Sequence, residues 1–138
     1  MALGNKGMPA MQEDFKRDDK ALGRDGEGLA ASYLKGLGYK ILEKNFRCRL
    51  GEVDLIVERK GALTFVEVKT RRSVAAVSPR ELVTLPKQRH ISKVAQHYLA
   101  VRRLHDVNAD FAVLGIDFSG PSPQFEWIPN AFDLAWGF

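Results

Sequence analysis

Cysteine is nearly absent from this chain of 138 residues, and long hydrophobic runs are missing altogether. The single Cys48 excludes an intrachain disulfide and a zinc site built on several cysteines. The longest apolar stretches, such as Phe111–Ile116, are far shorter than the roughly 20 residues that a membrane-spanning helix needs. The first twenty residues also lack the continuous apolar core of a signal peptide. We therefore expect a cytoplasmic protein without a membrane segment.

Basic residues are missing from the end of the chain, where residues 106–138 carry only acidic charges and sum to −5. In contrast, residues 59–105 hold 11 Lys and Arg against two acids and sum to +9, while residues 1–58 are neutral. A basic block of this size within one domain is typical of a protein that binds a polyanion. A solvated basic helix would give the same charge, so the count alone leaves both interpretations open.

The remaining composition, 45% hydrophobic and 28% charged, is that of an ordinary globular domain. The length suits one domain with its own core and is too short for two. Residues 1–21 are polar and aperiodic, which predicts a flexible N-terminal arm. We expect residues 22–138 to form a single domain.

The hydrophobic pattern predicts alternating helices and strands. A helical stripe from Arg24 ends before Gly38, a residue type that often follows a helix. A second helix has a capping box at Ser78 and Glu81, is restarted or kinked at Pro86, and continues as an apolar stripe to Val101. The expected strands cover residues 39–47, 51–59, 62–72, 111–118 and a shorter 124–128, with a hairpin turn at Lys60-Gly61. The order αβββαβ with a final strand or tail predicts an α/β sheet flanked by helices.

The second and third expected strands carry a charged pattern that suits chemistry. Side chains alternate along a strand, so Glu52 and Asp54 share one face, as do Glu67 and Lys69. A hairpin would bring Asp54 close to Glu67, and converging carboxylates suit magnesium or manganese. Such a cation assists water in attacking a phosphodiester, and a nearby lysine stabilises charge on the phosphate. The pattern therefore predicts a metal-dependent phosphodiesterase.

A simpler explanation covers the same residues. Val66 to Lys69 shows ordinary alternation for a half-buried strand, and Asp54 could form a cross-strand ion pair with Lys69. The hairpin context and the basic block that follows favour the catalytic interpretation over this one.

Motifs spread along residues 23–132 resemble a known bacterial family. They are Gly26-Glu27, Ala30, Tyr33-Leu34, Gly38-Tyr39, Ile41-Leu42, Asn45, GEVDLI from Gly51, FVEVKTRR from Phe65 and LPKQRHISKVAQHYL from Leu85. On these residues the chain is similar to the YraN family, also called uncharacterised protein family 0102. The resemblance implies a restriction-endonuclease-like fold with a central mixed sheet, the PD-(D/E)xK nuclease core, and a likeness to archaeal Holliday junction resolvases.

The resemblance also implies roles for individual residues. Asp54 matches the central metal-binding aspartate, Glu67 and Lys69 match the E-x-K pair, and Glu27 matches the acid that completes the metal site. For Glu27 alone, an ordinary acid in the first turn of a helix is the alternative.

A second set of residues is expected to contact nucleic acid. Arg71 and Arg72 directly follow the catalytic strand and could contact phosphates, with solvated loop arginines as the alternative. Related nucleases place residues like Lys87 and Gln88 toward the site or the nucleic acid; a surface role for Gln88 is equally open. The full expected set is Arg71, Arg72, Lys87, Gln88, Arg89 and Lys93, and its cations would make binding salt-dependent.

The leading hypothesis is therefore a Mg²⁺- or Mn²⁺-dependent endodeoxyribonuclease acting on branched or structured DNA. Alternatives are a nucleic-acid-binding module that keeps the fold without catalysis, and a DNA-processing partner protein that docks through residues 106–138. A homodimer is expected by analogy with resolvases that cut two strands. Many family members have Arg-Phe-Asp-Val where this chain has Asp110-Phe111-Ala112-Val113, which affects substrate geometry more than metal binding.

Overall fold

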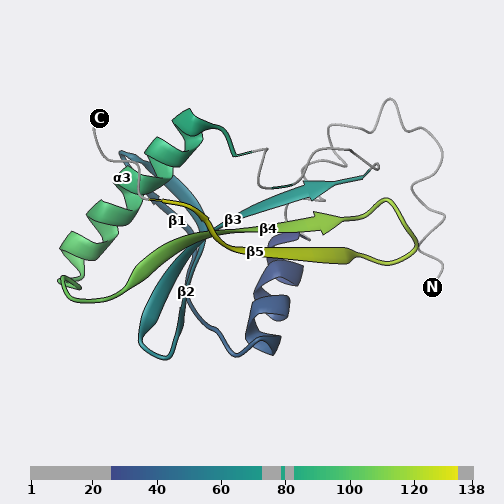
Figure 1. The fold of residues 1–138 in the computed structure, drawn as a ribbon, viewed down its shortest axis with the longest axis horizontal. Helices are drawn as coiled ribbons and strands as arrows, with labels where there is room; N and C mark the ends of the chain where they lie inside the picture. The colour runs from purple at the N-terminus through teal and green to yellow at the C-terminus, as the bar shows by residue number, and fades with distance from the viewer. Residues whose placement is uncertain (1–25, 73–78, 80–82, 134–138) are drawn as a thin grey trace.

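The computed structural model of the chain describes residues 26–72, 79 and 83–133. A helix over residues 26–36, here the first helix, precedes five strands and a longer helix (Figure 1). Their bounds are β1 Lys40–Cys48, β2 Gly51–Arg59, β3 Ala62–Arg71, α3 Leu85–Val101, β4 Ala109–Asp117 and β5 Gln124–Phe132. The predicted element order is confirmed. The expected N-terminal arm and the helix start at Ser78 and Glu81 lie outside the described residues.

The five strands form one mixed sheet in the order β1-β2-β3-β4-β5. β1 pairs with β2, β2 with β3 and β4 with β5 in antiparallel fashion, whereas β3 and β4 are parallel. The crossover from β3 to β4 contains α3, as a parallel connection requires. The α/β prediction is confirmed, and the architecture is consistent with a restriction-endonuclease-like core.

The turns form where the sequence predicts them. Gly38 ends the first helix with a φ of 94°, and the amides of Gly38 and Tyr39 close on the carbonyls of Lys35 and Leu34. This pair of hydrogen bonds satisfies carbonyls that a helix end leaves free. Lys60 and Gly61 join β2 to β3 with φ angles of 53° and 82°, as expected for a two-residue hairpin turn.

Two hydrophobic cores lie on opposite faces of the sheet, one under each helix (Figure 1). Phe65 packs in the α3 core, whereas its neighbour Val66 packs in the core of the first helix. β4 repeats this division at Phe111 and Ala112. Strands β3 and β4 are therefore buried on both faces. A charged side chain on β3 is costly unless an opposite charge or hydrogen bonds offset it.

Helix α3 is fixed to the sheet near both ends. The Thr84 hydroxyl caps its start by accepting from the Lys87 amide at 3.4 Å, and the expected restart at Pro86 is confirmed by a proline in the first turn. Near its end, Glu43 of β1 accepts from the Tyr98 hydroxyl at 3.3 Å and from Arg102 at 2.9 Å. The end of α3 is therefore held to β1, and its start is held to β3 by the ion pair between Lys87 and Glu67.

Strand β5 is longer than the sequence predicts. Paired residues shift from Val113↔Ile128 to Phe111↔Phe132, so β5 contains extra residues opposite β4. Pro129 lies within this bulge, next to Asn130 with a φ of 51°. The expected end at Ile128 is wrong because a bulge accommodates the proline without ending the strand. Within the described ranges, no helix is long and apolar enough to cross a membrane.

Candidate active site

The β2–β3 ladder ends where the acidic residues begin. Its last pair is Leu55↔Val66, and continuing this register places Asp54 opposite Glu67. Beyond this pair, the Val68 amide donates to a side chain of β2 instead of to its backbone. The acceptor is Asp54 Oδ2, at 2.7 Å. The hairpin therefore brings Asp54 and Glu67 together, as the sequence pattern predicts.

Glu67 is a charged side chain in an apolar setting, with only 5% of its surface exposed. Its Oε2 lies 3.6 Å from Lys69 Nζ and 3.4 Å from Lys87 Nζ. Lys69 comes from the same face of β3, whereas Lys87 comes from the first turn of α3. Two lysines therefore offset one buried carboxylate, and Lys69 pairs along its own strand instead of across to Asp54.

Glu27 reaches the site from the first helix, and Asn45 of β1 holds it. The Asn45 Nδ2 donates to Glu27 Oε1 at 2.9 Å. Asn45 has a φ of 51°, a left-handed conformation that asparagine tolerates better than most residues. It lies between the pairs Lys44↔Leu55 and Phe46↔Val53, so the register places it opposite Asp54.

The electrostatics of Asp54 confirm that three acids are neighbours. Burial, the charge of Glu67 and more weakly that of Glu27 raise the pKa of Asp54 to about 7. The hydrogen bond from the Val68 amide and the charge of Lys87 act in the opposite direction. Burial and the neighbouring acids therefore outweigh the positive charge of Lys87 at Asp54, and a carboxyl with such a raised pKa is common in functional sites.

The donor chemistry of this cluster fits a hard divalent cation, although its present arrangement is not a complete metal cage. In the part of the chain that the structure describes, no group of three or more His, Cys, Asp or Glu side chains is positioned to hold a metal ion. Glu27 is engaged by Asn45, and Glu67 is engaged by two lysines. Asp54, Glu67 and Glu27 supply the carboxylate oxygens that Mg²⁺ and Mn²⁺ prefer, so a role as ligands stays a prediction.

The residues expected to contact nucleic acid divide into different environments. Lys87 points to Glu67, and Gln88 donates its amide to the Val83 carbonyl at 3.0 Å, which ties the helix start to the preceding segment. Arg71 forms an ion pair with Asp117 of β4 at 3.5 Å. Arg72 and Arg89 are exposed, whereas Lys93 is half-buried. Lys87 therefore joins the acidic cluster directly through its ion pair with Glu67.

The departures from the family pattern lie away from the cluster. Asp110 accepts from the Thr64 hydroxyl at 2.8 Å, near the start of β3. Ala112 is fully buried in the core under the first helix. Asp110 therefore serves a hydrogen bond between β3 and β4, and Ala112 belongs to the core.

Sequence reasoning missed the role of Asn45 and the pairing of Lys87 with Glu67. Asn45 is in the family pattern, and an asparagine inside a strand-like run is itself a signal for an unusual backbone. The Lys87 contact joins segments 20 residues apart through the packing of α3, and charge patterning alone does not indicate it.

Fold and site together define an α/β protein whose mixed sheet brings a cluster of acids and lysines to one strand end. The chain belongs to the family described as Uncharacterised protein family UPF0102, whose sequence model matches residues 26–118. A UPF0102 protein of Geobacter metallireducens is 52% identical over 118 residues, covering 86% of this chain and 97% of that protein. One from Geotalea daltonii is 46% identical over 127 residues, covering 91% and 100%. The family expected from the motifs is thus confirmed.

Similarity to solved structures is much weaker. The structure of Pyrococcus furiosus SfsA in complex with Ca²⁺ matches with a TM-score of 0.36 and 12% identity, covering 80% of this chain and 63% of that one. A likeness at this level carries no conclusion about the present chain.

Proposed function

We propose that the protein is a metal-dependent endonuclease that hydrolyses phosphodiester bonds in DNA, with branched or structured DNA as its substrate class. The observation that carries the proposal is the acidic cluster of buried Glu67 with half-buried Asp54 and Glu27, and with Lys69 beside it. Acids that crowd together and raise the pKa of one of their number are costly for a fold that makes no use of them.

The residues of the cluster would divide the work. Asp54 and Glu67, with Glu27 as the third acid, would hold Mg²⁺ or Mn²⁺, which supplies Lewis acidity for the attack of water on the phosphodiester. The Lys69 ammonium would donate to a phosphate oxygen as negative charge develops there. Lys87 is the second cation at Glu67 and would help to attract the phosphate backbone. Asn45 would orient Glu27 through its hydrogen bond.

The basic block supports DNA as the ligand. Arg72 and Arg89 are exposed on the segments that flank the cluster, directly after β3 and in the first turns of α3. Together with Lys93 and Arg71 they would contact phosphates without reading sequence. Binding should therefore weaken steeply as the salt concentration rises.

The test is a cleavage assay on a four-way junction, a flap, single strands and duplex DNA, each with Mg²⁺, Mn²⁺ or a chelator. Asp54→Asn is the informative variant because an asparagine oxygen still accepts from the Val68 amide. We expect it to lose at least about 100-fold in cleavage rate. Asp110→Asn is the matched control, since Asp110 is also a hydrogen-bonded acid of the sheet but lies away from the cluster.

Cleavage that survives the chelator or the Asp54→Asn exchange would refute the proposed site. A protein that binds DNA in a salt-dependent manner but cuts none of these substrates with either metal would be a non-catalytic binding module. That outcome would replace the nuclease proposal.

A further inference from the structure

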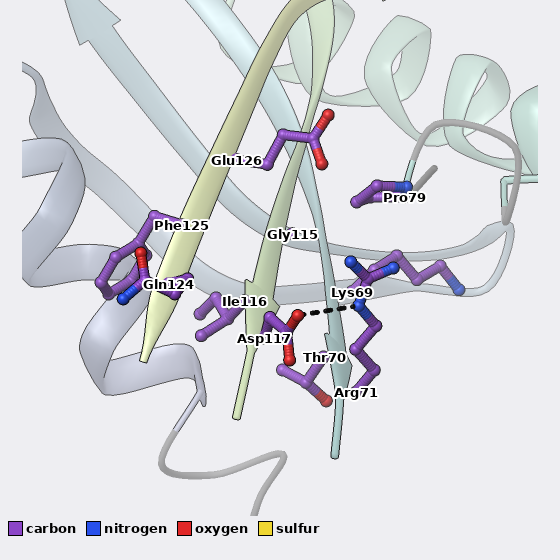
Figure 2. Close-up of a pocket in the computed structure, with 10 residues that line it drawn as sticks. All are labelled: Lys69, Thr70, Arg71, Pro79, Gly115, Ile116, Asp117, Gln124, Phe125 and Glu126. Atoms are coloured by element: carbon purple, nitrogen blue, oxygen red, sulfur yellow. Dashed lines mark ion pairs between the residues drawn. The ribbon is translucent and has the colours of Figure 1, made fainter. Parts of the chain in front are cut away.

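A pocket of about 310 Å³ lies beside the acidic cluster, at the end of β3 and β4 and the start of β5 (Figure 2). Lys69 and Arg71 line it from β3, on the same strand face as Glu67. Lys69 therefore belongs both to the pocket and, through its ion pair with Glu67, to the cluster. A ligand bound at Lys69 could extend into the pocket without a break.

The register of the sheet gives the pocket two different sides. Lys69 pairs with Gly115 of β4, and Gly115 pairs with Glu126 of β5, so these residues form one row across three strands. Adjacent strands are about 4.8 Å apart, which separates the Lys69 and Glu126 backbones by roughly 10 Å. The row thus has a cation at one end, an acid at the other and, at Gly115, a residue without a side chain in the middle. Figure 2 shows Gly115 lying between these strands.

Gly115 is required for the wall of the pocket. A Cβ atom at this position would lie 2.3 Å from Cγ of Pro79, so the proline ring rests directly on the glycine backbone. Pro79 therefore contributes an apolar ring to the pocket, whereas the ring of Phe125, which also borders it, stacks on Tyr33 of the first helix. Flat apolar surface of this kind suits the face of a planar ligand.

The charged residues of the pocket indicate how a ligand would be oriented between the β3 side and the β5 side. Lys69 gives the β3 side of the pocket a cation that suits a phosphate, while the charge of the neighbouring Arg71 is offset by its ion pair with Asp117. Asp117 is already paired with Arg71, so the acidic side of the pocket is formed by β5. Glu126 and Gln124 are exposed there and offer acceptor oxygens, which suit an amino group better than a phosphate. An anionic group at one end and a planar, amino-bearing ring at the other describe a nucleotide.

We propose that this pocket binds one unpaired nucleotide of the DNA, with its phosphate at Lys69 and its base beside Pro79 with the exocyclic amine toward Glu126. The proposal deepens the proposed function and rests on it for the nature of the ligand. A base in an intact duplex is stacked and paired, and therefore does not reach such a pocket without being extruded. The pocket thus selects flaps, single-stranded ends and junction points, and favours cytosine over thymine, which lacks the amine.

The test measures binding by fluorescence anisotropy with the full chain in chelator, so that no cleavage is needed. The probes are flap oligonucleotides that carry cytosine, thymine or an abasic residue at the unpaired position next to the branch, and a fully paired duplex. We expect the abasic probe to bind about tenfold more weakly than the cytosine probe, and the thymine probe to lie between them. The duplex should bind at least as weakly as the abasic flap.

Glu126→Leu should remove the preference for cytosine over thymine, so that the cytosine and thymine probes bind with equal affinity. Glu58→Leu, which removes the same charge at the far end of β2, is the matched control and should keep the preference. Thermal unfolding of both variants shows that each still folds.

The outcomes separate this proposal from the proposed function. Equal affinity for the cytosine, thymine and abasic probes, together with metal-dependent cleavage, would overturn the pocket and leave the nuclease. Base-dependent binding that Glu126→Leu abolishes, without cleavage in any metal, would support the pocket and overturn the nuclease. A chain that binds none of the probes would overturn both.

Discussion

Strand β3 forms a hydrogen bond to a carboxylate near each of its ends, and the surroundings of the two carboxylates differ. Near the start, Thr64 donates its hydroxyl to Asp110 of β4 at 2.8 Å, and one donor meets one acceptor. Further along, Asp54 accepts from the Val68 amide at 2.7 Å but also lies near Glu67 and Glu27. The carboxylate near the start of β3 has a neutral hydrogen-bond partner in Thr64. The carboxylate near the end of β3 lies in a half-buried site together with two other acids.

The difference shows where the fold accepts an electrostatic cost. Lys69 and Lys87 offset Glu67, yet burial and the neighbouring acids still raise the pKa of Asp54 to about 7. Hydrogen bonding at Asp110 stabilises the protein on its own. The raised pKa of Asp54 means that the folded protein pays a cost for the ionised form of this side chain, which is a reason to place function there.

The largest expected effect comes from removing the charge of Asp54. The pKa of this group rises from 3.8 in the unfolded chain to about 7 in the folded one, so the folded state binds more protons between these values. Stability is therefore lost as the pH rises through this window, and the loss is complete above pH 7. We expect Asp54→Asn to raise the free energy of unfolding by about 2 kcal/mol at pH 8 in chelator, and to change it little below pH 4.

Urea unfolding at the two pH values measures this effect. Asp110→Asn is the control and should lower stability at pH 8, because a charged acceptor makes the stronger hydrogen bond with Thr64. An equal gain for Asp54→Asn at both pH values would contradict the assigned crowding of charge. Mg²⁺ at pH 8 should stabilise the native protein and not this variant.

A smaller effect should follow from releasing Glu27. Asn45→Gly removes the hydrogen bond to Glu27 and still permits the φ of 51°. Partners that orient metal ligands contribute tenfold or more to affinity, so we expect Mn²⁺ to bind about tenfold more weakly in calorimetric titration. Asn130→Gly is matched in residue type and in φ but lies on β5, and it should bind Mn²⁺ as the native chain does. Equal weakening in both variants would show a general loss of stability instead.

The smallest effect on stability is expected near the start of β3, at the hydrogen bond between Thr64 and Asp110. Thr64→Val keeps the shape of the buried side chain and removes the donor to Asp110, which should lower the free energy of unfolding by about 1 kcal/mol. A double-mutant cycle with Asp110→Ala isolates this term, because the cost of Thr64→Val should largely disappear when its acceptor is absent. An unchanged cost would assign the effect to packing. Cleavage should stay at the native rate.

Most of the fold could be predicted because local signals agree with it. Gly38 and the pair Lys60-Gly61 adopt the left-handed angles that their positions require, and strand-like runs became strands. The length of β5 could not be predicted, because a proline ordinarily ends a strand and only pairing with β4 shows that a bulge absorbs it. The parallel pairing of β3 with β4 was likewise beyond local pattern, and the family resemblance implied no more than a mixed sheet.

The sequence predicts which residues form the candidate site better than it predicts the contacts between them. Alternation along β3 and the hairpin turn suffice to bring Asp54 and Glu67 together. Neither signal indicates that Lys87 would pair with Glu67, or that Asn45 would hold Glu27, because both contacts depend on how helices pack on the sheet. The pocket at Gly115 is lined from three strands and was not foreseen at all.

The parallel pairing of β3 with β4 also sets an order of assembly. β1, β2 and β3 are joined by short turns, so the hairpin that holds Asp54 and Glu67 forms from contacts close in sequence. β4 joins β3 only after residues 72–108 have closed as a loop, and such distant pairing is the slow part of folding. A chain emerging from the ribosome would thus form its acidic hairpin first and complete the edge of β3 last. Before β4 pairs with β3, the free edge of β3 can pair with strands of other molecules. The pairing of β4 closes this edge and thereby protects the protein from aggregation.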